Sequence, residues 1–182
     1  MKYADALWGR ALHKAVKEYI CTYGSNPVDV FASEWIACHG LALDYRRGDT
    51  WHSLYETGKK HMRDFPERFR QESIVPYLVE SNLISVFNGY YSKRLRPDMV
   101  AMKDGKYLIL DIKCGRTWTQ EMVDAEEQLD EYANDLIPYF NLDSIAVCVC
   151  NLTRGGQINF IYGNREVKEK IEEDALEMEV IW

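Results

Sequence analysis

The chain has 182 residues, of which 47% are hydrophobic and 13% aromatic, which is enough apolar material for one domain with its own core. Its formal net charge of −7 argues against a protein that binds nucleic acid over its whole surface, because phosphate affinity comes from Lys and Arg. Basic residues do cluster at Arg68/Arg70 and at Lys93/Arg94/Arg96, which fits either a local positive groove or an ordinary solvated surface.

Helical patterns dominate the first part of the chain. Apolar residues from Leu7 to Ile20 recur at helical spacing. A cap signal at Asn26 and another at Asp49 or Thr50 predict two more helices. The predicted helical ranges are 7–20, 27–45 and 49–65, the last ending before Pro66. Periodicity from Glu67 to Val79 is ambiguous, and Pro76 argues against a central strand there.

The second part of the chain alternates like strands, with Asn88-Gly89 and Asp104-Gly105 as turn signals. Strands are predicted at 83–87, 96–102, 107–113, 144–150 and 157–162, with a turn over 154–156. A long helix is predicted over 119–136, with Pro138 just past its end, and a charged helix from Asn164 to Met178. This order predicts an α/β fold in one domain, residues 1–182.

The turn at Asp104-Gly105 fixes which residues face each other, because a two-residue hairpin sets the register of both strands. Paired residue numbers then sum to 209, so Asp98 falls opposite Asp111. Opposed side chains have Cβ atoms roughly 4.5–5.5 Å apart, where two carboxylates repel. Lys113, two residues beyond Asp111, joins the same face. A bulge or a longer turn would break this register.

Two carboxylates and an ammonium group on one face suit phosphodiester hydrolysis. Hard oxygen ligands bind Mg²⁺ or Mn²⁺, which can activate water and neutralise charge on a phosphate. Lys113 would position that water or stabilise developing charge. The alternative is a surface hairpin in which both aspartates bond to Lys113 and no chemistry follows.

Three short motifs occur in order along the chain. They are Gly9-Arg10-Ala11-Leu12-His13, then Pro97-Asp98 followed after twelve residues by Asp111-Ile112-Lys113, then Gln128-Leu129-Asp130-Glu131-Tyr132. Together they resemble the PD-(D/E)XK nuclease superfamily, and within it the RecB-like exonuclease branch. The resemblance implies a restriction-endonuclease-like core, a mixed central sheet flanked by helices.

The resemblance also implies a role for each matched residue. His13, Asp98 and Asp111 would bind the metal together with the carbonyl of Ile112, and Lys113 would be the catalytic lysine beside Asp98 and Asp111. Gln128 and Tyr132 would bind substrate. Glu80 stands where relatives often place an acidic residue, so it is a further candidate ligand, although an exposed glutamate is the simpler interpretation.

Two features depart from the pattern. The segment from about residue 27 to 70 matches no motif and resembles a helical insertion. Some members carry a four-cysteine iron–sulfur cluster, and none is expected here, because the five cysteines lack grouped spacing: Cys21, Cys38, Cys114, Cys148 and Cys150. Their odd number also fits neither a disulfide framework nor a zinc site.

The sequence thus predicts a metal-dependent deoxyribonuclease, more an exonuclease than a restriction enzyme, acting on single-stranded DNA or duplex ends in recombination or repair. A helicase or recombinase partner and a cytoplasmic location, possibly of phage origin in a host, are expected. No signal peptide or membrane span is expected. Two alternatives stay open. One is a catalytically silent nuclease-fold module that binds nucleic acid or assembles a complex. The other is an acidic interaction protein with a surface built on Trp8, Trp35 and Trp51.

Overall fold

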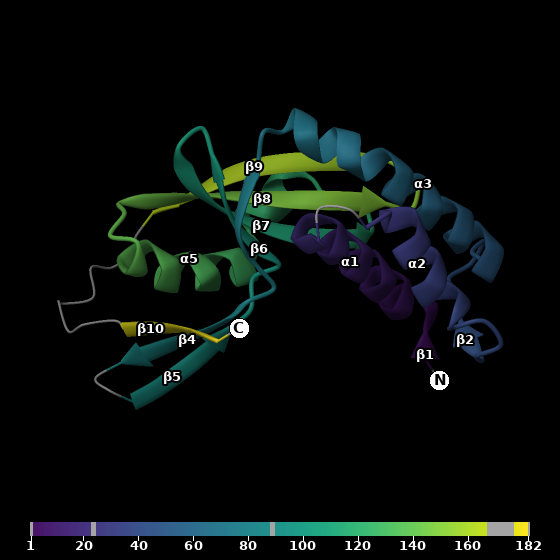
Figure 1. The fold of residues 1–182 in the computed structure, drawn as a ribbon, viewed down its shortest axis with the longest axis horizontal. Helices are drawn as coiled ribbons and strands as arrows, with labels where there is room; N and C mark the ends of the chain where they lie inside the picture. The colour runs from purple at the N-terminus through teal and green to yellow at the C-terminus, as the bar shows by residue number, and fades with distance from the viewer. Residues whose placement is uncertain (1, 23–24, 88–89, 167–176, 182) are drawn as a thin grey trace. The chain divides into compact units, whose positions relative to one another are not determined.

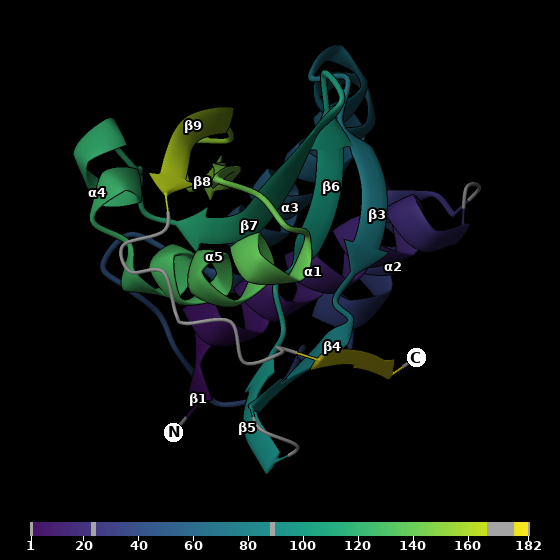
Figure 2. The same cartoon turned by 90° about the vertical axis from the view of Figure 1, so that its left-hand side faces the viewer.

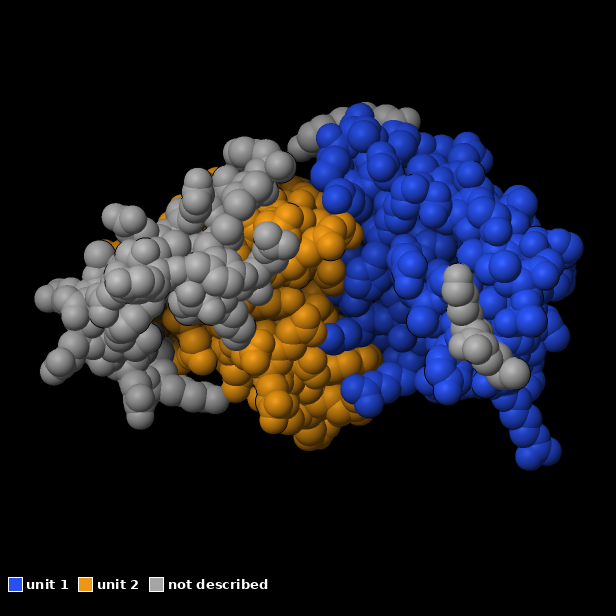
Figure 3. All heavy atoms as spheres, turned by 90° about the horizontal axis from the view of Figure 1, so that it is seen from below, with its two compact units in different colours: residues 1–73, 112–117, 150–159 blue, residues 74–111, 118–149, 160–182 orange. Residues whose placement is uncertain are grey.

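The computed structural model describes residues 2–22, 25–87, 90–166 and 177–181 (Figure 1). They form two compact units, coloured separately in Figure 3. Unit 1 contains residues 1–73, 112–117 and 150–159, and unit 2 contains residues 74–111, 118–149 and 160–182. Each unit combines segments that are distant in sequence, so the division does not follow a linker. The single domain expected from the sequence stays a prediction.

Unit 1 is mainly helical. It contains α1 (Ala4–Thr22), α2 (Pro27–Ile36) and α3 (Trp51–Gln71), with short parallel strands β1 (Lys2–Tyr3) and β2 (Leu43–Asp44). Trp8 and Trp35 are at most 1% exposed, and the indole Nε1 of Trp8 donates to the carbonyl of Leu54 at 2.8 Å. These two tryptophans therefore belong to the core and cannot form an exposed interaction surface.

Local capping chemistry sets where α2 and α3 begin. The Asn26 side chain accepts from the amide of Val28, and Thr50 forms a reciprocal capping box with Ser53, so both helices start where the sequence predicts. The prediction of where these helices end is wrong. Helix α2 stops at Ile36 rather than Tyr45, ahead of a turn in which Gly40 has φ +86°.

Helix α3 continues through Pro66 to Gln71, although the sequence predicts that it ends before this proline. A proline inside a helix costs about 3 kcal/mol. Phe65 and Phe69, on either side of it, are 1% and 7% exposed and stack at 5.4 Å between ring centroids. Burying two such side chains contributes about 1.5–3 kcal/mol each, which offsets the proline.

Strands and two helices make up most of unit 2. A mixed five-stranded sheet has the order β3-β6-β7-β8-β9, and a second sheet has the order β10-β4-β5. The strands are β3 (Val75–Val79), β4 (Asn82–Phe87), β5 (Tyr90–Leu95), β6 (Met99–Lys103), β7 (Lys106–Gly115), β8 (Ser144–Thr153), β9 (Ile158–Glu166) and β10 (Glu177–Ile181). The ends of β7 and β8 and the start of β9 lie in unit 1. Strand β3 is at the sheet edge, in agreement with Pro76.

Several predicted boundaries in this unit need correction. The single helix over 119–136 is divided into α4 (Gln120–Asp124) and α5 (Glu127–Tyr139), and Pro138 lies inside the last turn of α5. Strand β5 has no counterpart in the prediction. Asn164 lies within β9, so it does not begin a helix. Residues 167–176 of that predicted helix, and the predicted turn at Asn88-Gly89, lie outside the described residues.

Helix α5 covers one face of the sheet in unit 2 (Figure 2). Val100 of β6 and Ile109 of β7 are both fully buried and belong to the same core as Leu129, Ala133 and Leu136 of α5. Residues two positions away along each strand share this face. The face therefore continues toward Asp98 and Asp111.

The hairpin of β6 and β7 has the predicted register. Its five residue pairs run from Met99↔Leu110 to Lys103↔Lys106, and the numbers in each pair sum to 209. Asp104 and Gly105 have φ +51° and +75°, as a type I′ turn requires. Extending the register by one pair places Asp98, the residue before β6, opposite Asp111.

Of the helices in the described ranges, not one combines the length and apolar character that a bilayer crossing requires.

Gly58 of α3 provides a test of the packing in unit 1. A Cβ at this buried position would lie 2.0 Å from Cζ of Phe31. Alanine gains about 1 kcal/mol of helix propensity over glycine. We nevertheless expect Gly58→Ala to lower the free energy of unfolding by about 1–3 kcal/mol, because the ring must move. Urea unfolding measures this change. The loss should shrink in a Phe31→Ala background, and wild-type stability for Gly58→Ala would contradict the packing.

We expect His61 of α3 to make the stability of the protein depend on pH. Its ring is fully buried, and Nε2 lies 2.7 Å from the carbonyl oxygen of Thr153, to which it donates. Burial lowers the pKa of His61 below its ordinary value of 6.5. Below pH 6.5 the unfolded chain therefore binds a proton that the folded chain does not, so stability falls as the pH decreases.

We expect the free energy of unfolding to fall by at most about 1.4 kcal/mol per pH unit below pH 6.5 through His61. The measurement is urea unfolding at pH 7.5 and 5.5. The His61→Gln variant should lose this part of the slope, whereas His52→Gln, at an exposed position, should keep it. Equal slopes for wild type and His61→Gln would refute the assignment.

Candidate metal and substrate site

The carboxylates of Glu80 and Asp98 in unit 2 lie close together, at the turn between β3 and β4. Glu80 has φ +42°, a left-handed conformation that non-glycine residues seldom adopt. Its amide donates to the carbonyl of Asp98 at 2.8 Å. One carboxylate oxygen of Glu80 and one of Asp98 lie within 4.8 Å of each other, and both residues are half-buried. The turn thus brings together two acidic residues that are 18 positions apart.

This closeness has an electrostatic cost. Two ionised carboxylates whose oxygens lie within 4.8 Å of each other repel. Arg96 provides compensation: its Nη2 lies 2.9 Å from Oε2 of Glu80, and its Nε donates to the Glu80 carbonyl at 3.4 Å. The side chain of Arg96 is 57% exposed, so solvent weakens the ion pair.

Residues Gln128 and Tyr132 of α5 lie next to the segment that leads to Asp98. The Tyr132 hydroxyl donates to the carbonyl of Arg96 at 3.1 Å, and Nε2 of Gln128 donates to the hydroxyl at 2.7 Å. Tyr132 is only 6% exposed. These bonds hold the main chain two residues before Asp98, which is a positioning role. Substrate contact by this pair stays a prediction.

Strand β7 carries the other motif residues. Asp111, the last residue of this strand in unit 2, is 4% exposed, and its Oδ2 is buried. Ile112 and Lys113 follow in unit 1, Ile112 buried and Lys113 half-buried. Alternation along the strand puts the side chains of Asp111 and Lys113 on one face and Ile112 on the other.

Asn151 of β8 is a positioning residue that the motifs do not reveal. It is fully buried, and its Nδ2 donates to the carbonyls of Lys113 at 3.1 Å and Arg116 at 2.9 Å. Both bonds lie within unit 1 and fix the main chain where β7 ends. The signal in the sequence is the polar side chain of Asn151 next to an apolar stretch, because a buried polar group requires hydrogen-bond partners.

His13 lies on α1 in unit 1 and is half-buried. One turn earlier, Gly9 approaches β7: a Cβ added there would lie 3.7 Å from Cβ of Cys114. Cys114 directly follows Lys113, so the start of α1 passes close to the end of β7 within this unit. The metal-binding role of His13 stays a prediction.

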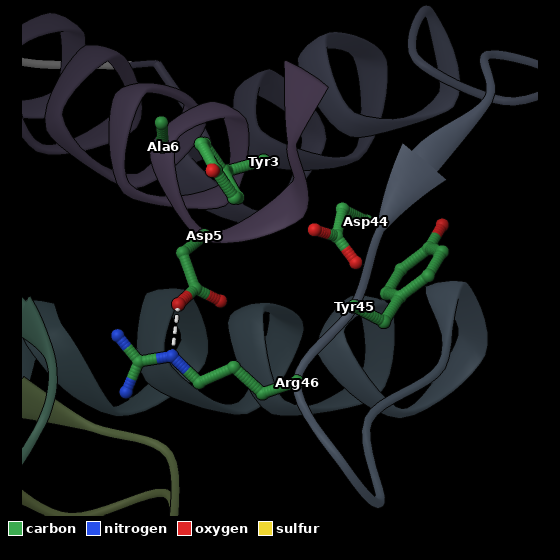
Figure 4. Close-up of a pocket in the computed structure, with 6 residues that line it drawn as sticks. All are labelled: Tyr3, Asp5, Ala6, Asp44, Tyr45 and Arg46. Carbon is green, nitrogen blue, oxygen red and sulfur yellow. Dashed lines mark ion pairs between the residues drawn. The ribbon is translucent and has the colours of Figure 1, made fainter. Parts of the chain in front are cut away.

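A surface pocket of unit 1 lies elsewhere and contains none of the predicted site residues (Figure 4). Its lining includes Asp5, whose Oδ2 pairs with Nε of Arg46 at 2.6 Å. Arg154 forms ion pairs with Asp5 and with Asp49. This network ties the start of α1 to two loops, which indicates a structural junction. The full lining is Tyr3, Asp5, Ala6, Asp44, Tyr45 and Arg46.

No family model and no curated protein matches the chain. Among solved structures, one titled "Crystal structure of SSO0001" aligns over 88% of this chain and 68% of its own, with 11% sequence identity and a TM-score of 0.35. A likeness this weak supports no inference about the site.

The hydroxyl of Tyr132 can be removed without changing its packing. We expect Tyr132→Phe to lower the free energy of unfolding by about 1 kcal/mol, because it leaves the Arg96 carbonyl without this donor. Tyr139→Phe is a matched control at an exposed position of the same helix, with an expected change below about 0.5 kcal/mol. Urea unfolding compares them, and equal effects would show that the hydroxyl of Tyr132 does not hold this segment.

Proposed function

We propose that this protein is a Mg²⁺- or Mn²⁺-dependent deoxyribonuclease with a restriction-endonuclease-like core. The observation that carries the proposal is the approach of the Glu80 and Asp98 carboxylates to within 4.8 Å, at a turn held in a left-handed conformation. A left-handed non-glycine residue beside a second carboxylate supports a functional site at this turn. The confirmed hairpin register supports Asp111 as a third acid on the same face.

The chemistry of the donors fits a hard divalent cation. Carboxylate oxygens are the ligands that Mg²⁺ and Mn²⁺ prefer, and the ion bridges protein acids to substrate phosphate. We assign Glu80, Asp98 and Asp111 as acidic ligands. The resemblance to PD-(D/E)XK nucleases adds His13 and the carbonyl of Ile112. When bound, the ion would lower the pKa of a water molecule and neutralise charge on the phosphate.

The remaining residues would orient the reaction. Lys113 would hold the attacking water or stabilise charge on the phosphate, since its side chain shares a strand face with Asp111. Asn151 would keep the end of β7 in place through the Lys113 carbonyl. Gln128 would reach the substrate, while Tyr132 would act through the main chain before Asp98.

The proposed substrate is DNA with a free end, either single-stranded or duplex, and the proposed mode is exonucleolytic. A helicase or recombinase that supplies such ends would be a suitable partner, and the proposed location is the cytoplasm. These assignments rest on the motif resemblance. The net charge of −7 favours one alternative, a nuclease-fold module that binds nucleic acid or assembles a complex without cleaving it.

The test is cleavage of end-labelled DNA, single- and double-stranded, linear and circular, with Mg²⁺ or Mn²⁺. We expect linear substrates to be lost while circular ones survive. Asp111→Ala and Lys113→Ala should each lower kcat by at least about 10²-fold, as removal of groups that stabilise the transition state does.

Matched controls are Asp143→Ala and Lys106→Ala, which remove the same charges from exposed positions and should cleave at the wild-type rate. Thermal unfolding checks that every variant is folded. Full activity in the double variant Asp111→Ala/Lys113→Ala would refute the assignment. DNA binding without turnover in both metals would favour the silent module.

A further inference from the structure

Arg96 is an exposed arginine immediately before the Pro97-Asp98 motif. Its guanidinium donates two hydrogen bonds to Glu80: Nη2 to the carboxylate at 2.9 Å and Nε to the carbonyl at 3.4 Å. Its main-chain carbonyl is fixed by Tyr132. The side chain and the main chain of Arg96 are thus each held by a hydrogen bond beside the acidic pair.

The ion pair with Glu80 is easily exchanged. Pairs with a partner this exposed contribute little to stability, because water solvates the guanidinium of Arg96 and salt screens its charge. Glu80 is also a proposed metal ligand, and one carboxylate cannot satisfy a divalent cation and a guanidinium equally well. A cation at Glu80 and Asp98 would weaken the hold of Glu80 on Arg96.

We infer that Arg96 binds a phosphate of the substrate. Without metal its guanidinium pairs with Glu80, and a divalent cation bound by Glu80 releases it. This inference rests on the proposed nuclease function. A guanidinium offers two parallel N–H donors that match two phosphate oxygens, and it stays charged at any physiological pH. Residue 96 immediately precedes Pro97-Asp98, so the released side chain would still start from a main chain next to the acidic pair. Its partner there is the DNA phosphodiester.

The exchange makes paired predictions of opposite sign. Removing Arg96 takes a positive charge away from Glu80, so Arg96→Ala should bind Mn²⁺ more tightly than wild type, by up to about fivefold. The same variant should bind DNA about tenfold more weakly in Mn²⁺. In EDTA, where Glu80 holds Arg96, the loss should be less than about twofold. A merely structural role would not produce tighter metal binding.

The experiment uses the full chain. Mn²⁺ affinity is measured by electron paramagnetic resonance without DNA, and DNA affinity by fluorescence anisotropy with a labelled single-stranded phosphorothioate oligonucleotide, which resists cleavage. Arg96→Lys keeps the charge but lacks the planar fork, so its DNA affinity should fall between those of wild type and Arg96→Ala. Arg63→Ala removes an exposed arginine of α3 in unit 1, and its DNA affinity relative to wild type should be the same in Mn²⁺ and EDTA.

Glu80→Gln provides an independent arm in case Arg96→Ala does not fold. This substitution weakens the ion pair between residue 80 and Arg96. In EDTA, where no metal competes for residue 80, the variant should therefore bind DNA more tightly than wild type. Unchanged Mn²⁺ affinity in Arg96→Ala, or equal DNA affinity of Arg96→Ala and wild type in Mn²⁺, would overturn the inference and leave the nuclease proposal standing. Failure of the wild-type protein to bind Mn²⁺ would instead overturn the proposed function itself.

Discussion

The positive φ angles of Asp104 and Gly105 set the arrangement on which the candidate site depends. They close a two-residue turn that pairs β6 with β7 so that Val100 and Ile109 share the face covered by α5. A slip of one residue would send every side chain of one strand to the other face. The buried core therefore fixes the register. Extending that register by one pair places Asp98 and Asp111 on the same face.

The approach of Glu80 to Asp98 works against two physical preferences at once. The backbone of Glu80 is in a conformation that costs on the order of 1–3 kcal/mol, and the two carboxylates repel. The amide bond from Glu80 to the Asp98 carbonyl and the ion pair with Arg96 offset part of this cost. In the proposed function, a divalent cation would offset more of it.

Two main-chain carbonyls beside the motifs accept hydrogen bonds from buried side chains. Tyr132 bonds to the carbonyl of Arg96, just before Asp98, and Asn151 bonds to the carbonyl of Lys113. Such contacts orient neighbouring side chains through the main chain. The buried faces of α5 and β8 thus link core packing to the geometry of the site.

The sequence by itself determined the hairpin register and the starts of α2 and α3, because a turn or a cap depends on groups within a few residues. Only the tertiary structure decided that α3 continues through Pro66, since the deciding term is burial of aromatic rings against distant segments. The same holds for the meeting of Glu80, Arg96 and Asp98. Their positions depend on how edge strand β3 packs on β6, and no local pattern encodes the pairing of distant strands.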